Sequence, residues 1–103
     1  MHFAIEKKIF IFAIMKLSII IPVYNTEQTL EKCVDSVLQS SLNNFEIILV
    51  NDGSTDNSAN ICESYKNSYP EQVLVIHQKN QGLSAARNAG LGIAKGQYHF
   101  CRL

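Results

Sequence analysis

Two kinds of segment alternate along residues 16–100. Residues 17–24 (LSIIIPVY) and 45–51 (FEIILVN) are almost continuous apolar runs rich in β-branched side chains. Such runs are typical of strands that are covered on both faces of a sheet. Residues 72–78 (QVLVIHQ) predict a third strand, and residues 97–100 (QYHF) predict the start of a fourth.

Helical periodicity separates the predicted strands. After the first strand, apolar residues recur at spacings of three and four, which places them on one helix face: Leu30, Cys33, Val34, Val37 and Leu38. A second helix is predicted over residues 55–69 and is closed by Pro70. A third helix follows a loop that begins at residue 80, and this helix ends at Gly96. The predicted N-caps are Asn25 or Thr26, then Ser54 or Thr55, then Ser84.

The order strand–helix–strand–helix–strand–helix–strand predicts an α/β fold with a parallel sheet and flanking helices. Right-handed crossovers bring the carboxyl ends of all the strands to one edge, where open sheets of this kind bind their ligands. Three polar segments follow the first three strands: PVYNTE, NDGSTDNS and QKNQGLSAARN. We therefore expect these segments to lie together.

The second polar segment carries the most chemistry. Asp52 directly follows a strand, so its carboxylate can accept hydrogen bonds from a ligand, and Gly53 permits a tight turn. Ser54 or Thr55 would cap the next helix, and Asp56 would lie at the positive end of the helix dipole. A turn and helix start without any ligand explains this hexamer equally well. The recurrence of polar segments after three strands favours a binding site.

Composition narrows the class of protein. The chain has 103 residues, 47% of them hydrophobic, and nine basic residues balance nine acidic ones. One globular domain is therefore expected. Nucleic acid is not expected as a partner, because there is no basic face for phosphates. Three widely spaced cysteines indicate reduced thiols in a cytoplasmic protein rather than a metal cluster or a disulfide framework.

Residues 1–15 form an apolar N-terminal extension (MHFAIEKKIFIFAIM) that is separate from the predicted domain at residues 16–103. It has no small-residue cleavage site, and Lys16 interrupts the run before it reaches the roughly 20 residues that a membrane span needs. Upstream sequence before a natural start at Met15 is one explanation. An anchor at the membrane surface is the alternative.

The motifs IIIPVYN, IILVNDGSTDNS and NQGLSAARNAG, in this order and spacing, closely resemble the start of family 2 glycosyltransferases of the GT-A fold. The resemblance covers about residues 16 to 100. It implies a Rossmann-like GT-A sheet, here incomplete, and transfer of a sugar from a nucleotide-diphosphate donor, with a UDP-sugar favoured, to an acceptor hydroxyl. A dinucleotide-binding domain is disfavoured, because no G-x-G-x-x-G follows the first strand.

The resemblance also implies roles for individual residues. Pro22, Tyr24 and Glu27 match the first nucleotide-contacting loop, with Tyr24 near the base and Glu27 near the nucleoside. Asp52 matches the acid that binds the base. Gly82 and Arg87 belong to the third loop and helix, where Arg87 would approach the diphosphate.

The family pattern would continue after the fourth strand with an Asp-x-Asp motif that holds Mn²⁺ or Mg²⁺ against the diphosphate. Here the sequence reads Cys101-Arg102-Leu103, so no metal site is expected in this chain. The acceptor and the general base would lie beyond it. We therefore expect an inactive nucleotide-binding fragment, cut before this motif. A non-catalytic nucleotide-binding module and the product of a broken reading frame are the alternatives.

Two expectations concern association. Half of a GT-A sheet has an open edge, which favours self-association. A cytoplasmic location is expected, and the inner face of the membrane is the alternative if the apolar extension is an anchor.

Overall fold

The computed structural model describes residues 16–101 and 103, so the predictions for residues 1–15 lie outside it. Within this part of the chain, strands and helices alternate as the sequence pattern predicts. They are β1 (Leu17–Val23), α2 (Leu30–Leu38), β2 (Phe45–Asp52), α3 (Ser58–Ser68), β3 (Val73–Gln78), α4 (Leu83–Ile93) and β4 (Gln97–Phe100).

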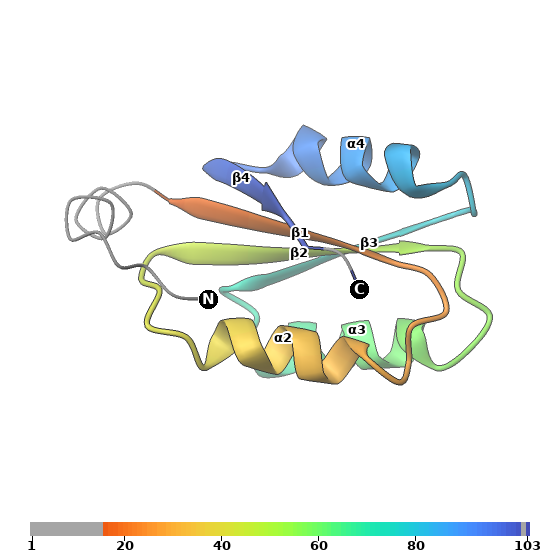
Figure 1. The fold of residues 1–103 in the computed structure, drawn as a ribbon, viewed down its shortest axis with the longest axis horizontal. Coiled ribbons are helices and arrows are strands. Elements are labelled where there is room, and N and C mark those ends of the chain that lie inside the picture. Colours follow the sequence, from red (N-terminus) through yellow and green to blue (C-terminus); the bar gives the residue numbers. More distant parts are fainter. Residues whose placement is uncertain (1–15, 102) are drawn as a thin grey trace.

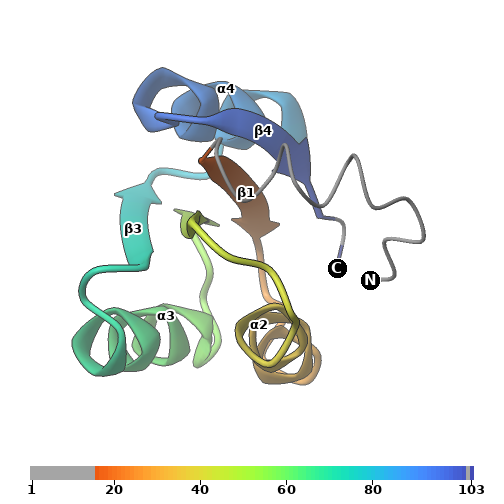
Figure 2. The same ribbon diagram turned by 90° about the vertical axis from the view of Figure 1, so that its left-hand side faces the viewer.

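The strands form one parallel sheet in the order β3-β2-β1-β4, which confirms the predicted α/β class. Leu17 of β1 lies opposite Phe45 of β2 on one side and Gln97 of β4 on the other. Helices α2 and α3 cover one face of the sheet, and α4 covers the other (Figures 1 and 2). The molecule is thus a three-layer sandwich with β1 and β2 in its middle.

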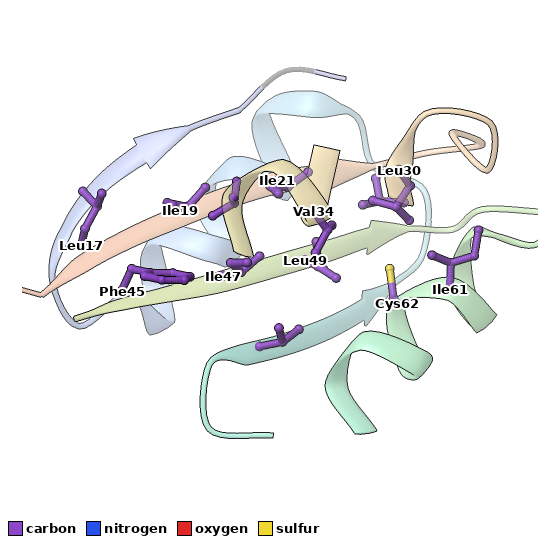
Figure 3. Close-up of a cluster of buried hydrophobic side chains, with 13 residues drawn as sticks. Leu17, Ile19, Ile21, Leu30, Val34, Phe45, Ile47, Leu49, Ile61 and Cys62 are labelled. Atoms are coloured by element: carbon purple, nitrogen blue, oxygen red, sulfur yellow. The ribbon is translucent and has the colours of Figure 1, made fainter. Parts of the chain in front are cut away.

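Both faces of the central strands are buried, as their continuous apolar runs predict. Ile19 and Ile21 of β1 pack with Ile47 and Leu49 of β2 beneath α2 and α3 (Figure 3), and Ile20 packs on the opposite face with α4. Burial of each such side chain contributes about 1.5–3 kcal/mol.

The helix starts differ from the predicted ones. Helix α3 begins at Ser58, three residues later than predicted, and α4 begins at Leu83, directly after Gly82. The predicted Ser84 cap is wrong, and in the described part of the chain none of the three helices has a side-chain capping bond at its N-cap residue. The polar side chains between β2 and α3 bind another loop instead, as described below.

Helix α4 ends at Ile93, before the predicted Gly96, because the following residues are tied to the sheet. The buried Glu46 carboxylate accepts the Lys95 N–H at 2.9 Å and the Ser18 hydroxyl at 2.5 Å. The Gly96 N–H donates to Ser18 Oγ at 3.0 Å, and a Cβ at residue 96 would lie 1.9 Å from the Lys16 carbonyl oxygen. This connection fixes where β4 joins the sheet.

Among the residues that the structure describes, no helix has the length and apolar character needed to cross a bilayer.

Candidate functional site

A pocket of about 510 Å³ lies at the carboxyl end of β1 and β2, beside the start of α4. Figure 1 shows the loops after β1, β2 and β3 at this same end of the sheet. Five of the predicted site residues line the pocket: Pro22, Tyr24, Asp52, Gly82 and Arg87. The topology therefore brings together residues from all three polar segments.

Glu27 is not among the residues that line this pocket. It lies in a neighbouring groove with Asp56, and the two hollows share Thr26 and Leu103. The Glu27 backbone N–H donates to Asp56 Oδ2 at 3.2 Å. The first loop is thus divided, with Tyr24 facing the main pocket and Glu27 placed beside it.

Asn25 joins the first two loops. Its backbone is left-handed, with φ of 51°, a conformation that asparagine tolerates better than most residues. Its side-chain Oδ1 accepts the Thr55 N–H at 2.8 Å, the Asp56 N–H at 3.3 Å and the Thr55 hydroxyl at 3.4 Å. One amide oxygen therefore holds the turn after β2 against the turn after β1.

Reciprocal bonds complete this contact between the loops. The Asn25 N–H donates to Ser54 Oγ at 3.0 Å, and the Thr26 N–H donates to Ser58 Oγ at 3.0 Å. Asp56 binds Glu27 through one oxygen and accepts the Ser58 N–H through the other at 2.9 Å. The side chains predicted to cap α3 thus mainly connect the loops, and only Asp56 also serves the helix start.

Asp52 organises the third loop. It is 3% exposed, and its Oδ1 accepts the Gln78 side-chain amide at 2.9 Å and the Gln81 N–H at 2.8 Å. Its Oδ2 accepts a hydrogen bond from the Gly82 N–H at 2.9 Å and a longer one from Asn80 Nδ2 at 3.2 Å. Asn80 Nδ2 also donates to the Asp52 backbone carbonyl. The longer, shared contact is the one that a ligand N–H can replace most easily.

Hydrogen bonding keeps Asp52 ionised. Burial alone raises the pKa of this carboxyl, but the bonds from Gln78, Gln81 and Gly82 outweigh burial and hold the pKa below its ordinary value. The pocket wall therefore carries a negative charge at neutral pH.

Gly53 lets the second and third loops approach closely. Its φ is 73°, and a Cβ at this position would lie 2.6 Å from the Asn80 backbone nitrogen. Any side chain would therefore clash with the third loop and strain the backbone.

Asn51 and His77 support the base of the second loop. The Asn51 Nδ2 lies 3.0 Å from His77 Nδ1, while its Oδ1 accepts the Ser54 N–H at 3.1 Å. The His77 Nε2 lies 2.7 Å from a Glu63 oxygen. Since an amide nitrogen only donates, His77 accepts at Nδ1 and carries its proton at Nε2. The histidine is therefore occupied by structural bonds.

Arg87 lies at the pocket beneath the end of β4. Its guanidinium carbon is 5.2 Å from the centre of the Phe100 ring, which is a cation–π distance. The Arg87 Nε finds no hydrogen-bond partner within residues 16–101 and 103. A positive, partly unsatisfied group thus faces the same pocket as the Asp52 carboxylate.

The described residues do not fit a metal site. They contain no group of three or more His, Cys, Asp or Glu side chains that could hold an ion. At the end of β4, where an Asp-x-Asp motif would be expected, the pocket is lined by Cys101 and Leu103.

The sequence profile of Glycosyl transferase family 2 matches residues 18–101. The chain belongs to this family. Among its relatives, Glycosyltransferase GlyA of Streptococcus pneumoniae is 48% identical over 83 residues, which is 81% of this chain and 12% of GlyA. The uncharacterised glycosyltransferase EpsJ of Bacillus subtilis is 50% identical over 82 residues, 80% of this chain and 24% of EpsJ.

Solved structures of glycosyltransferases share the fold. The Staphylococcus aureus TarS fragment 1–349 in complex with UDP has a TM-score of 0.76 and 30% identity, covering 85% of this chain and 27% of that one. A mannosyltransferase from Pyrobaculum calidifontis, solved with GDP-mannose and Mn²⁺, has a TM-score of 0.74 at 21% identity, which shows the fold alone. The predicted GT-A fold is confirmed, and the chain spans about a quarter or less of these relatives.

Sequence patterns missed the residues that connect the loops. The sequence pattern predicts only a helix cap at Asn25 and no role for Asn80, although both residues bind the loop that contains Asp52. A run of Asn, Ser, Thr and Asp is the signal that could have found them, because these short polar side chains readily bind nearby backbone groups.

Proposed function

We propose that residues 16–103 bind the nucleotide of a nucleotide-diphosphate sugar, with a uridine nucleotide favoured, within a glycosyltransferase that transfers the sugar to an acceptor hydroxyl. The observation that carries this proposal is the meeting of three polar loops around one pocket in a chain of this family. TarS, a relative in fold with 30% identity, was solved with UDP.

The pocket offers two groups suited to a pyrimidine base. Tyr24 is 50% exposed at the pocket and presents an aromatic ring on which a base can stack. The Asp52 carboxylate accepts hydrogen bonds only, which suits the ring N–H of uracil. In the bound state that N–H would replace the long contact from Asn80 on Oδ2.

Arg87 is suited to the diphosphate. Its guanidinium is positive at any physiological pH and offers forked donors that match phosphate oxygens. Gly82, with φ of 99° and open space at its Cβ position, leaves backbone exposed at the start of α4 beside Arg87. Helix N-termini favour anions, so both features attract the same part of the ligand.

A divalent cation supplies charge neutralisation at the diphosphate in many glycosyltransferases, and Mn²⁺ accompanies GDP-mannose in the Pyrobaculum enzyme. The described residues of this chain do not form such a site. We therefore propose binding that depends on the loops and Arg87, and binding without transfer is the second candidate function.

Titration calorimetry on the 103-residue chain tests the proposal with UDP, GDP and ADP in metal-free buffer. We expect UDP to bind best, and Asp52→Asn to weaken it about tenfold or more, equal to about 1.4 kcal/mol. Asp35→Asn is the matched control, because Asp35 accepts a bond from Tyr65 between α2 and α3, away from the pocket. Absence of heat with all three nucleotides on folded protein, or equal losses in both variants, would contradict the proposal.

We further propose a cytoplasmic location. Free cysteines at positions 33, 62 and 101 suit a reducing compartment.

A further inference from the structure

A continuous set of hydrogen bonds connects the surface of α3 with the turn after β2. Glu63 Oε2 lies 2.7 Å from Nε2 of His77, and Nδ1 of His77 lies 3.0 Å from Nδ2 of Asn51. The Asn51 Oδ1 accepts the Ser54 N–H at 3.1 Å. His77 of β3 is the register partner of Asn51 in β2, so the parallel pairing places both side chains on one face of the sheet. Glu63, His77 and Asn51 thus form a relay from α3 to this turn.

The direction of every bond in the relay follows from the one at its inner end. The Ser54 N–H can only donate, so the oxygen of the Asn51 amide must face it, and the amide nitrogen must face His77. The Nδ1 of His77 is then the acceptor, and Nε2 carries the proton that is donated to Glu63. This bond holds the pKa of the Glu63 carboxyl below its ordinary value, so the acceptor at the outer end is ionised at neutral pH.

Burial makes the orientation of the Asn51 amide matter. Asn51 is 5% exposed, whereas the side chains of His77 and Glu63 are each 45% exposed. A flipped amide would oppose its NH₂ group to the Ser54 N–H and its oxygen to the lone pair of His77, and both bonds would be lost. Buried groups that lose their partners in this way are costly, so the imidazole selects one orientation of the amide.

This orientation controls the turn that joins the two groups assigned to the base. Asp52 is the residue after Asn51 and lines the pocket. Ser54, held by Asn51, accepts the Asn25 N–H on its Oγ at 3.0 Å, and Asn25 directly follows Tyr24. The relay therefore holds a turn that is bonded to both Asp52 and the loop of Tyr24.

We propose that His77 is a positioning residue for nucleotide binding, which acts through Asn51 on the turn between Asp52 and Ser54 while Glu63 fixes its tautomer. His77 is not among the residues that line the pocket, so it acts without touching the ligand. This inference rests on the proposed function, because it takes the pocket to be the nucleotide site.

Two substitutions of His77 separate the ends of the relay. In His77→Asn, the amide oxygen is two bonds from Cβ, as Nδ1 is, so an acceptor for Asn51 remains and only the exposed contact with Glu63 is lost. In His77→Gln, the amide lies three bonds from Cβ, as Nε2 does, so a donor to Glu63 remains and the acceptor for Asn51 is lost.

Hydrogen exchange of the Ser54 amide, followed by NMR in the ligand-free chain, measures the relay without any nucleotide. His77→Gln should speed this exchange about three- to tenfold, the effect of one net hydrogen bond, and His77→Asn should leave it unchanged. Equal exchange at Ser54 in both variants would overturn the relay.

Titration calorimetry with UDP on the same samples measures the consequence for binding. Since fewer molecules hold the competent turn, His77→Gln should bind UDP about three- to tenfold more weakly, whereas His77→Asn should keep the wild-type affinity. Wild type and both variants that bind UDP equally would overturn the positioning role and leave the proposed function intact. A wild-type chain that binds no uridine nucleotide, while Ser54 exchange follows the relay, would overturn the proposed function and with it the role of His77 in binding.

A further measurement uses the unaltered chain and needs no variant to fold. Two-bond ¹H–¹⁵N correlation spectra at neutral pH should show His77 with Nδ1 unprotonated and Nε2 protonated. A His77 ring that carries its proton at Nδ1 would overturn the proposal, because that tautomer offers the Asn51 amide no acceptor.

Discussion

Asn25 offers the sharpest test of how the site is built. Its side chain joins the loops after β1 and β2, and its backbone is left-handed. Three substitutions separate these two roles. Asn25→Asp keeps an acceptor oxygen and tolerates the conformation, Asn25→Gly keeps only the conformation, and Asn25→Ala keeps neither.

The expected losses follow from the contacts. The Thr55 N–H bond is short, at 2.8 Å, whereas the two other contacts are longer, at 3.3 and 3.4 Å. At about 0.5–1.5 kcal/mol for a net hydrogen bond, losing this set costs about 1–2 kcal/mol. A non-glycine residue in the left-handed region adds about 1 kcal/mol. Asn25→Gly should therefore lose about 1–2 kcal/mol of unfolding free energy, Asn25→Ala about 2–3 kcal/mol, and Asn25→Asp the least.

Urea denaturation at 25 °C, followed by far-ultraviolet circular dichroism, measures these differences. Thermal midpoints give a second readout, because about 1 kcal/mol shifts the midpoint of a domain of this size by roughly 4–8 °C. The slopes against urea should match the wild type, which would show that the unfolded reference has not changed. Equal stabilities of the Gly and Ala variants, or an Asp variant as unstable as Ala, would refute the account of Asn25.

Three further predictions concern other parts of the molecule. Gly53→Ala should lose about 1–3 kcal/mol of unfolding free energy in urea denaturation, because its Cβ would lie 2.6 Å from the Asn80 backbone nitrogen and its φ is positive. The control Gly92→Ala has open space at its Cβ position in α4 and should be neutral or stabilising. Similar changes in the two variants would contradict this prediction. The pKa of Asp52 is lowered in the folded state. The ionised carboxylate therefore contributes its full share of the unfolding free energy above the unfolded pKa of about 3.9, and this share is lost as pH falls through the folded pKa. Stability measured from pH 7 to pH 2 should fall below about pH 4, less steeply in Asp52→Asn, and identical profiles would count against the role of this carboxylate. The outer edge of β4 has no partner strand among the described residues. Size-exclusion chromatography should therefore show self-association that rises with protein concentration and weakens in Tyr98→Lys, which places a charge at an exposed position of this strand. A monomer at every concentration would exclude association through this edge.

The sequence predicts the layers of this fold well because burial leaves a direct pattern. The apolar runs of β1 and β2 correspond to strands covered on both faces, and the spacing from Leu30 to Leu38 corresponds to the buried side of α2. Local capping rules failed at Ser84, because the N-cap of α4 is Gly82, two residues earlier, where φ is 99°.

The sequence predicts that the three polar segments meet, but not how they bind one another. Strand ends and topology placed Tyr24, Asp52 and Arg87 in one pocket. The four donors that surround the Asp52 carboxylate come from residues 26 to 30 positions further along the chain, and periodicity carries no information about such contacts. Glu27 lies in the neighbouring groove and not in the pocket, because the chain takes a left-handed turn at Asn25, two residues before Glu27.

The position of β4 beside β1 has a consequence for biosynthesis. Leu17 pairs with Gln97, so 80 residues separate the two partners. At about 5–20 residues per second, a ribosome needs about 4–16 s to supply the second neighbour of the first strand. During that interval one edge of a highly apolar segment stays open in the nascent chain, which makes this stage the natural point for chaperone engagement.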